Sequence, residues 1–132
     1  MVCLLKLFDF YKVTSHQPFS RFVVHLCQSM SNLSICSGSY HDKITHLDNA
    51  LQNFTRLQNL DLARNALLSL DGLSHLRHLE SLNLYYNNVC DLDELYKLKQ
   101  NKKLENIDLR LNPGSQAIRI HFFINIFVSD QK

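Results

Sequence analysis

The fold is decided by the stretch Leu79-Glu-Ser-Leu82-Asn-Leu84-Tyr-Tyr-Asn87-Asn-Val89. Its pattern, LxxLxLxxNxL, also begins 22 residues upstream at Leu57 (79 − 57), and its first nine positions recur 25 residues downstream from Leu104 (104 − 79), with Ile107 for the second leucine. Three copies in the same frame indicate a repeated supersecondary unit. Such a unit cannot bury its apolar face by itself and does so by stacking on its neighbours.

Each position of the repeat predicts local structure. The leucines of Leu82-Asn-Leu84 point inward from a strand, because side chains along a strand alternate between its two faces. The asparagine follows where the chain turns off the sheet, and there a buried side-chain amide can satisfy backbone groups that the turn leaves unpaired. We therefore expect a structural asparagine ladder at Asn65, Asn87 and Asn112.

Between the strands the leucines recur every three residues, from Leu67 to Leu79, which suits a short 3₁₀ or irregular return. Together these features are the leucine-rich-repeat signature. They predict an α/β solenoid: a short leucine-rich-repeat array with a parallel concave sheet and 3₁₀ or irregular convex returns. The polar stretch Lys99 to Lys103 lengthens the third return, and we expect it to be a solvated bulge.

The predicted leucine-rich-repeat domain spans residues 33–114. A degenerate cap repeat occupies 33–56, with Leu33-Ser-Ile35 as its strand and Cys36 to Lys43 as a loop, since terminal repeats are atypical. Repeats follow at 57–78, 79–103 and 104–114. Residues 1–32 are an unassigned N-terminal extension. Residues 115–132 are an atypical segment and a possible partial cap, whose alternating apolar residues suit either a strand or a buried helix.

Composition restricts the function. The 132 residues carry a net charge of +2, and between Ile44 and Gly114 eight Lys/Arg stand against nine Asp/Glu, so the basic stripe of a nucleic-acid binder is absent from the sequence. Neither apolar end segment reaches the roughly twenty residues that span a bilayer. The four scattered cysteines suit reduced thiols in a cytoplasmic protein.

The sequence does not predict an enzyme. Gly-rich phosphate loops and the GxSxG and HExxH patterns are absent from it. His75 and His78 are three residues apart but occupy outward positions of a convex return, so we expect solvated surface histidines rather than a metal site. We expect no catalytic residues, no cofactor, no metal and no small-molecule substrate.

Three stretches of the sequence indicate one family among leucine-rich-repeat proteins. They are Gly38-Ser-Tyr40-His-Asp-Lys43-Ile44-Thr-His46-Leu47, Leu82-Asn-Leu-Tyr85-Tyr86-Asn87-Asn and Asp108-Leu-Arg110-Leu-Asn112-Pro113. The stretch from Leu33 to Gly114 resembles the 22-residue repeat class, and within it the N-terminal domains of the seventy-two-kilodalton centrosomal protein family and its close leucine-rich-repeat relatives. That family continues into a coiled coil, and the resemblance leaves open whether this sequence is a truncated or imperfectly delimited form of a longer coiled-coil protein.

Alternation places a row of polar and aromatic side chains on the outward, concave face of the sheet, where tyrosine and arginine are typical binding anchors. The predicted partner-binding residues are Arg64, Tyr85, Tyr86, Arg110, Asp61, Asn83 and Asp108. The resemblance implies a non-catalytic scaffold that binds centrosomal or microtubule-associated proteins, located in the cytoplasm at the centrosome or cytoskeleton. The alternative is a regulatory subunit that docks onto an enzyme such as a protein phosphatase.

Overall fold

A computed structural model describes residues 21–35 and 43–113. The first twenty residues of the predicted extension, the predicted loop from Cys36 up to residue 42, and the segment 115–132 lie outside the described residues. Across the described ranges, no helix is long and apolar enough to cross a membrane.

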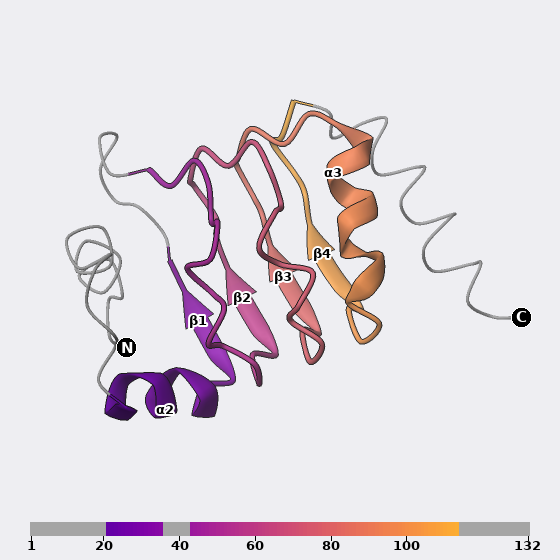
Figure 1. Cartoon of the computed structure of the whole chain (residues 1–132). Coiled ribbons are helices and arrows are strands. Elements are labelled where there is room, and N and C mark those ends of the chain that lie inside the picture. Colours follow the sequence, from indigo (N-terminus) through magenta and orange to yellow (C-terminus); the bar gives the residue numbers. More distant parts are fainter. Residues whose placement is uncertain (1–20, 36–42, 114–132) are drawn as a thin grey trace, which may run out of the picture.

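The described residues form one parallel sheet of four short strands (Figure 1). The elements in chain order are α2 (Arg21–Ser29), β1 (Asn32–Ser34), β2 (Asn59–Asp61), β3 (Ser81–Asn83), α3 (Leu92–Tyr96), the 3₁₀ helix η2 (Lys97–Gln100) and β4 (Asn106–Asp108). The strands lie side by side in chain order, and each pairs with the strand of the next repeat. The predicted short leucine-rich-repeat solenoid is therefore confirmed.

The register of the sheet stacks equivalent residues of successive repeats into one core. Leu33, Leu60, Leu82 and Ile107 are directly paired across β1 to β4. The leucines of the strands and of the returns meet behind the sheet, and Leu57, Leu67, Leu70, Leu73, Leu76, Leu79 and Leu84 are fully buried. Burying a leucine side chain contributes about 1.5–3 kcal/mol, so this apolar column is the main source of stability.

The first two returns turn back by repeated three-residue steps. The N–H groups of Leu73, Leu76 and Leu79 each donate to the carbonyl of the residue three positions earlier. This is the 3₁₀ pattern that the leucine spacing indicates, because residues i and i+3 lie on one side of such a turn.

The third return differs from the expected irregular loop. It contains the short helix α3 followed by η2, which lie beside β4 in Figure 1. Asp91 caps α3 by accepting from the Asp93 N–H at 3.5 Å. The predicted solvated bulge at Lys99–Lys103 is wrong at its centre, because Asn101 is buried and its Nδ2 donates to the carbonyls of Leu73 and Leu76 at 2.9 Å.

Helix α2 was not expected from the sequence, where residues 1–32 had no assignment. In Figure 1 it lies beside the end of β1 at which the strand begins. Its Cys27 side chain is buried in the core cluster, and the partly buried Met30 packs against that cluster. Burial raises the pKa of the Cys27 thiol, so it is less reactive than a free cysteine. Cys27 and Cys90 are both free thiols, and only Cys90 is exposed.

Candidate protein-binding face

The predicted ladder asparagines lie inside the turns that follow the strands. Asn65, Asn87 and Asn112 are all buried. The Nδ2 of Asn87 donates to the carbonyls of Leu62 and Leu84 at 2.9 and 3.1 Å, and its Oδ1 accepts from the Leu67 N–H at 3.0 Å. One amide thus joins the strand turn of its own repeat to the turn and the return of the preceding repeat.

The same geometry recurs on both sides of Asn87. Asn65 donates to the carbonyls of Ile35 and Leu62 and accepts from the Ile44 N–H. Asn112 donates to the carbonyls of Leu84 and Leu109 and accepts from the Val89 N–H. Since each asparagine bonds two repeats, the backbone of the turns is held in one conformation across the array.

The residue before each ladder asparagine has a left-handed backbone. Arg64, Tyr86 and Leu111 have φ angles of 59°, 56° and 57°. The N–H of Arg64 donates to the Tyr85 carbonyl and that of Tyr86 to the Arg110 carbonyl, so the sheet bonding continues into the turns. All three side chains are exposed, with 50% for Tyr86 and 57% for Leu111. They form a row along one edge of the sheet.

The acidic and amide residues at the strand ends cap these turns. The Oδ1 of Asp61 accepts from the Ala63 N–H at 2.9 Å, Asn83 accepts from the Tyr85 N–H at 3.0 Å, and Asp108 accepts from the Arg110 N–H at 3.0 Å. Asp61, Asn83 and Asp108 are also directly paired in the sheet register. Each side chain therefore has a structural task in its own turn, in addition to any contact with a partner.

A stack of cations and aromatic rings connects the repeats 79–103 and 104–114 with the cap repeat. The Arg110 guanidinium lies 5.5 Å from the centre of the Tyr85 ring and forms a two-pronged ion pair with Asp108, its shortest bond being 2.6 Å. The rings of Tyr85 and Tyr86 are 6.3 Å apart, and the Lys43 ammonium lies 5.4 Å from the centre of the Tyr86 ring. Cations above aromatic faces attract through the ring quadrupole. Because the Asp108 carboxylate accepts hydrogen bonds from the Arg110 guanidinium and attracts its positive charge, the pKa of Arg110 is raised.

The structure brings together most of the predicted site residues and adds one. Tyr85, Tyr86, Arg110 and Asp108 are in one connected group, while Asp61 and Asn83 lie on the neighbouring strands of the same face. Lys43 was missed because it belongs to the degenerate cap repeat, far from Tyr86 in sequence. Ala63 lies two positions after Asp61, so strand alternation would place it on the outward face as well; it is instead buried at 9% exposure because the chain has already begun to turn.

Beside this stack runs a groove of about 760 Å³. The described residues that line it are Lys43, Thr45, Ala66, Tyr86, Asn88, Leu111, Pro113 and the three ladder asparagines. We call it the turn-edge groove. It follows the edge where the strands end, across the repeats.

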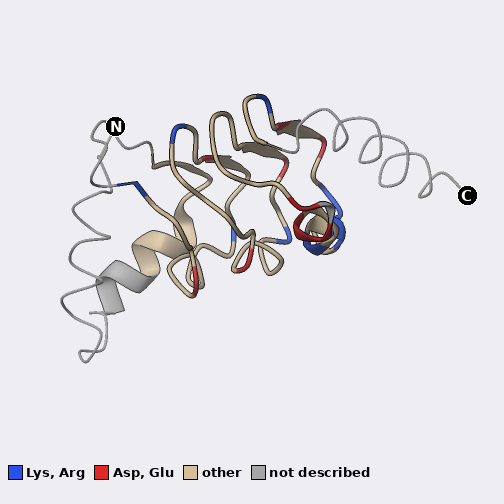
Figure 2. Cartoon of the chain, turned by 90° about the horizontal axis from the view of Figure 1, so that it is seen from above, with Lys and Arg blue, Asp and Glu red and all other residues tan. Residues whose placement is uncertain are grey.

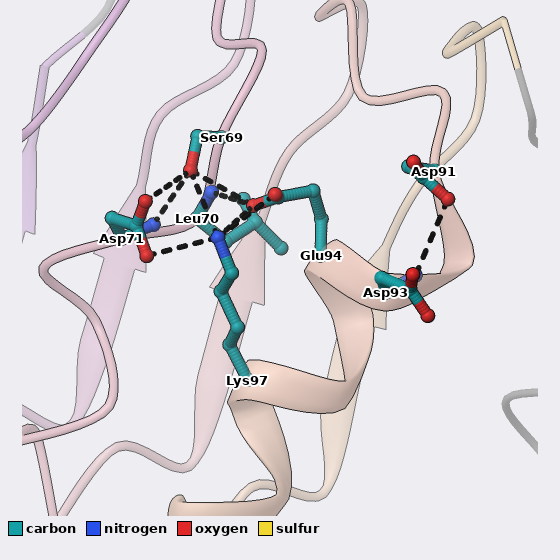
Figure 3. Close-up of polar contacts among 7 residues, drawn as sticks. All are labelled: Ser69, Leu70, Asp71, Asp91, Asp93, Glu94 and Lys97. Atoms are coloured by element: carbon teal, nitrogen blue, oxygen red, sulfur yellow. Dashed lines mark hydrogen bonds and ion pairs between the residues drawn. The ribbon is translucent and has the colours of Figure 1, made fainter.

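A second polar cluster lies on the return side of the solenoid (Figure 3). The Lys97 ammonium lies 2.9 Å from Asp71 and 2.8 Å from Glu94, and Glu94 also accepts from the Leu70 N–H at 2.8 Å. The Ser69 hydroxyl oxygen is 2.9 Å from a carboxylate oxygen of each acid, so its single proton serves one of them at a time. The cluster ties the second return to helix α3.

The cluster shifts the titration of its members. Hydrogen bonding from Lys97 lowers the pKa of Asp71, while Glu94 and then Asp71 raise the pKa of Lys97. Burial raises the pKa of Glu94, but bonds from Lys97, Leu70 and Ser69 outweigh it, and the net pKa is lowered. Every cation and anion here is paired, so this surface is a structural clamp rather than a reactive centre.

His75 is placed differently from the expected solvated histidine. It is half-buried, and its Nε2 lies 2.9 Å from the Leu51 carbonyl oxygen of the preceding repeat. His78 is exposed and 3.4 Å from the Lys103 ammonium. In the part of the chain that the structure describes, no group of three or more His, Cys, Asp or Glu side chains is arranged to hold a metal ion.

The parallel strands and their returns define a leucine-rich-repeat domain, and residues 55–97 match the family model described as leucine rich repeats (2 copies). The domain resembles that of the centrosomal protein of 72 kDa from Mus musculus, to which the chain is 50% identical over 84 residues. It also resembles the human leucine-rich repeat-containing protein 36, with 47% identity over 76 residues.

These matches cover 64% and 58% of this chain but only 13% and 10% of the two relatives. The chain therefore corresponds to a small part of each relative's length. Among solved structures, a chain in the crystal structure of the Drosophila melanogaster SNF/U2A' complex has a TM-score of 0.60 at 25% identity, covering 84% of this chain and 62% of that one. The fold and these relatives support a protein–protein interaction role.

Proposed function

We propose that this domain is a non-catalytic docking module that recruits partner proteins to the centrosome or microtubule-organising centre. Support for the location comes from the centrosomal relative, which is 50% identical over the repeat domain. Support for docking comes from the surface, where the half-buried Tyr85 and the exposed Tyr86 are held between two cations at the edge of the sheet.

The observation that carries the proposal is the stack from Arg110 through Tyr85 and Tyr86 to Lys43. Tyrosine and arginine are the residues in which binding energy concentrates at protein interfaces. The two rings are already positioned by their cations and by the left-handed turn at Tyr86, so little side-chain freedom is lost on binding. Preorganisation of this kind favours affinity on a small surface.

The size of the sheet favours a short segment of a partner over a large globular subunit. Four strands spaced by about 4.8 Å span roughly 14 Å. A phosphatase catalytic chain, the alternative partner, requires an interface of roughly 800 Å² on each side. The described concave face, with strands of three residues, is short for that purpose.

The test is the centrosomal enrichment of a fluorescent fusion of the full chain, measured as the ratio of signal at the centrioles to signal in the cytoplasm. We expect enrichment that falls several-fold in the double variant Tyr85→Ala/Tyr86→Ala. Tyr96→Ala is the matched control, because Tyr96 is another exposed tyrosine (41%) and lies 5.0 Å below the ammonium of Lys99, on α3.

Absence of enrichment for the unchanged chain would contradict the location. Equal loss in the Tyr96 control and the double variant would contradict the assignment of the surface. Thermal melts of all three fusion-free chains show that the comparison is between folded proteins.

A further inference from the structure

The turn-edge groove has an internal order that follows from the repeat. The residue after each ladder asparagine lines it: Ala66, Asn88 and Pro113. The residue before the asparagine lines it as well in two repeats, with the exposed Tyr86 and Leu111. Ala66 has the smallest side chain of this row, so it leaves more room in the groove than Asn88 or Pro113.

Among the described residues that line the groove, the charged side chain is that of Lys43 and none is acidic. Arg64 is exposed and occupies the position in its repeat that Tyr86 and Leu111 occupy in theirs. Figure 2 shows basic segments at the tips of turn loops with acidic segments on the adjoining strands, and both kinds together around α3. The groove is therefore complementary to a negatively charged ligand.

The charge of the array as a whole favours a peptide over a nucleic acid. Over residues 43–113, nine Lys/Arg (the eight of the array plus Lys43) balance nine Asp/Glu. Asp61 and Asp108 lie at the strand ends of the same face, where a phosphate backbone would approach them. Neither aspartate lines the groove, so a peptide short enough to stay within it can meet Lys43 and Arg64 without lying on the two carboxylates.

The groove also suits an extended backbone. Four repeats spaced by about 4.8 Å give a length of roughly 14 Å, which four or five extended residues cover at about 3.3 Å each. Among the lining residues, Tyr86, Leu111 and Pro113 offer apolar surface for one side chain, while Thr45 and Asn88 offer polar groups for the peptide backbone.

We propose that the turn-edge groove binds an extended acidic segment of a partner protein, with an apolar side chain against Leu111 and Pro113 and carboxylates toward Lys43 and Arg64. This inference rests on the proposed docking function and specifies the chemistry of the partner. The bound partner is a linear segment, so the groove recognises its negative charges and one apolar side chain rather than the surface of a folded domain.

The test uses the full chain and an array of synthetic peptides of about six residues, in which acidic, basic or uncharged residues surround a central leucine. We expect selective capture of the acidic set, with affinity that decreases as salt screens the charges. The strongest acidic peptide, fluorescently labelled, then gives dissociation constants by anisotropy for the variants.

Arg64→Glu should weaken binding of the acidic peptide about three- to tenfold, as expected for reversal of one exposed charge. Lys103→Glu is the matched control, because Lys103 is exposed on the return side, and it should leave binding unchanged. Ala66→Trp replaces a small lining side chain with a large one that occupies the groove, and it should abolish binding even at low salt. All variants are compared by thermal melting, so that loss of binding is separated from loss of fold.

Preference for basic peptides, equal capture of all peptide sets, or tighter binding of single-stranded RNA than of the acidic peptide would each overturn the inference. The outcomes for the two proposals are distinguishable. If no acidic peptide binds while Tyr85→Ala/Tyr86→Ala still abolishes centrosomal enrichment, the groove proposal fails and the docking function stands. If neither effect is seen, both fail.

Discussion

Removal of the central ladder amide tests how the array is held together. In Asn87→Ala, three hydrogen bonds disappear from a side chain that is 3% exposed. The neighbouring Asn88 is exposed, so Asn88→Ala is a matched control with the same change of residue type one position further along the chain. The prediction concerns the difference in unfolding free energy between these two variants.

The magnitude depends on which partners of Asn87 keep another bond. The Leu62 carbonyl also accepts from Asn65 at 3.0 Å, and the Leu84 carbonyl from Asn112 at 2.8 Å. These carbonyls lose one of two donors, at about 0.5 kcal/mol each. The Leu67 N–H has Asn87 Oδ1 as its acceptor, and leaving a buried donor unpaired costs about 1–3 kcal/mol. The total is roughly 2–4 kcal/mol.

Such a loss is a large share of the ~5–15 kcal/mol that stabilises a typical domain. Urea unfolding followed by circular dichroism measures it as a lower midpoint at a similar slope. We expect Asn88→Ala to stay within about 0.5 kcal/mol of the unchanged chain. Equal effects of the two substitutions would refute the ladder as a source of stability. Asn87→Asp should be at least as harmful at neutral pH, because it turns a carboxylate toward two carbonyl oxygens.

Three further perturbations address the returns. Lys97 lowers the folded pKa of Asp71 and Glu94, so both carboxyls stabilise the fold above their unfolded pKa values of about 4, and this contribution should disappear as pH falls below 4 through the lower folded values. Melting temperatures between pH 3 and 7 measure the effect, and the slope should flatten in Lys97→Met. Gly72 has a φ of +88°, and a Cβ there would collide with a backbone carbonyl oxygen, so Gly72→Ala should cost more than about 1 kcal/mol in urea unfolding, whereas an unchanged midpoint would contradict this. Asn101→Ala should cost about 1 kcal/mol in the same assay, because the Leu73 and Leu76 carbonyls each lose one of two donors at about 0.5 kcal/mol each; an unchanged midpoint would contradict it.

The strands and the first two returns were predictable because their signal is periodic. Leu60 and Leu82 define strands by alternation, and Leu70 to Leu79 define returns by their spacing of three. These rules state which side chains are buried and do not depend on rotamers. Burial of many identical residues at fixed intervals leaves few alternative folds, so this part of the structure follows from the sequence with little ambiguity.

The third return escaped prediction because a spacing of three also fits one turn of α-helix. Asp91, Asp93 and Glu94 carried the missing signal: an N-cap aspartate followed by acidic residues in the first turn favours a helix start. Helix α2 had a weaker signal in the sequence, because no repeat pattern includes residues 21–29.

The site was predictable only in part, for a geometric reason. Alternation identifies which strand residues face outward, and it named Tyr85 and Arg110. The contact of Lys43 with Tyr86 depends on side-chain directions and on a loop in the degenerate repeat, which periodicity does not describe. The groove depends further on the small size of Ala66, which is meaningful only once its neighbours in the row are known.

The residues just before the ladder asparagines are better explained by binding than by the needs of the backbone. A left-handed backbone costs most non-glycine residues about 1–2 kcal/mol, and glycine or asparagine would avoid much of that cost. The chain nevertheless has Arg64, Tyr86 and Leu111 there, three unlike side chains on the same backbone conformation. The adjacent ladder position has asparagine each time. Backbone requirements thus explain why the ladder position is always asparagine. They do not explain the residue before it, where a cationic, an aromatic and an aliphatic side chain give the edge of the sheet a different chemistry in each repeat.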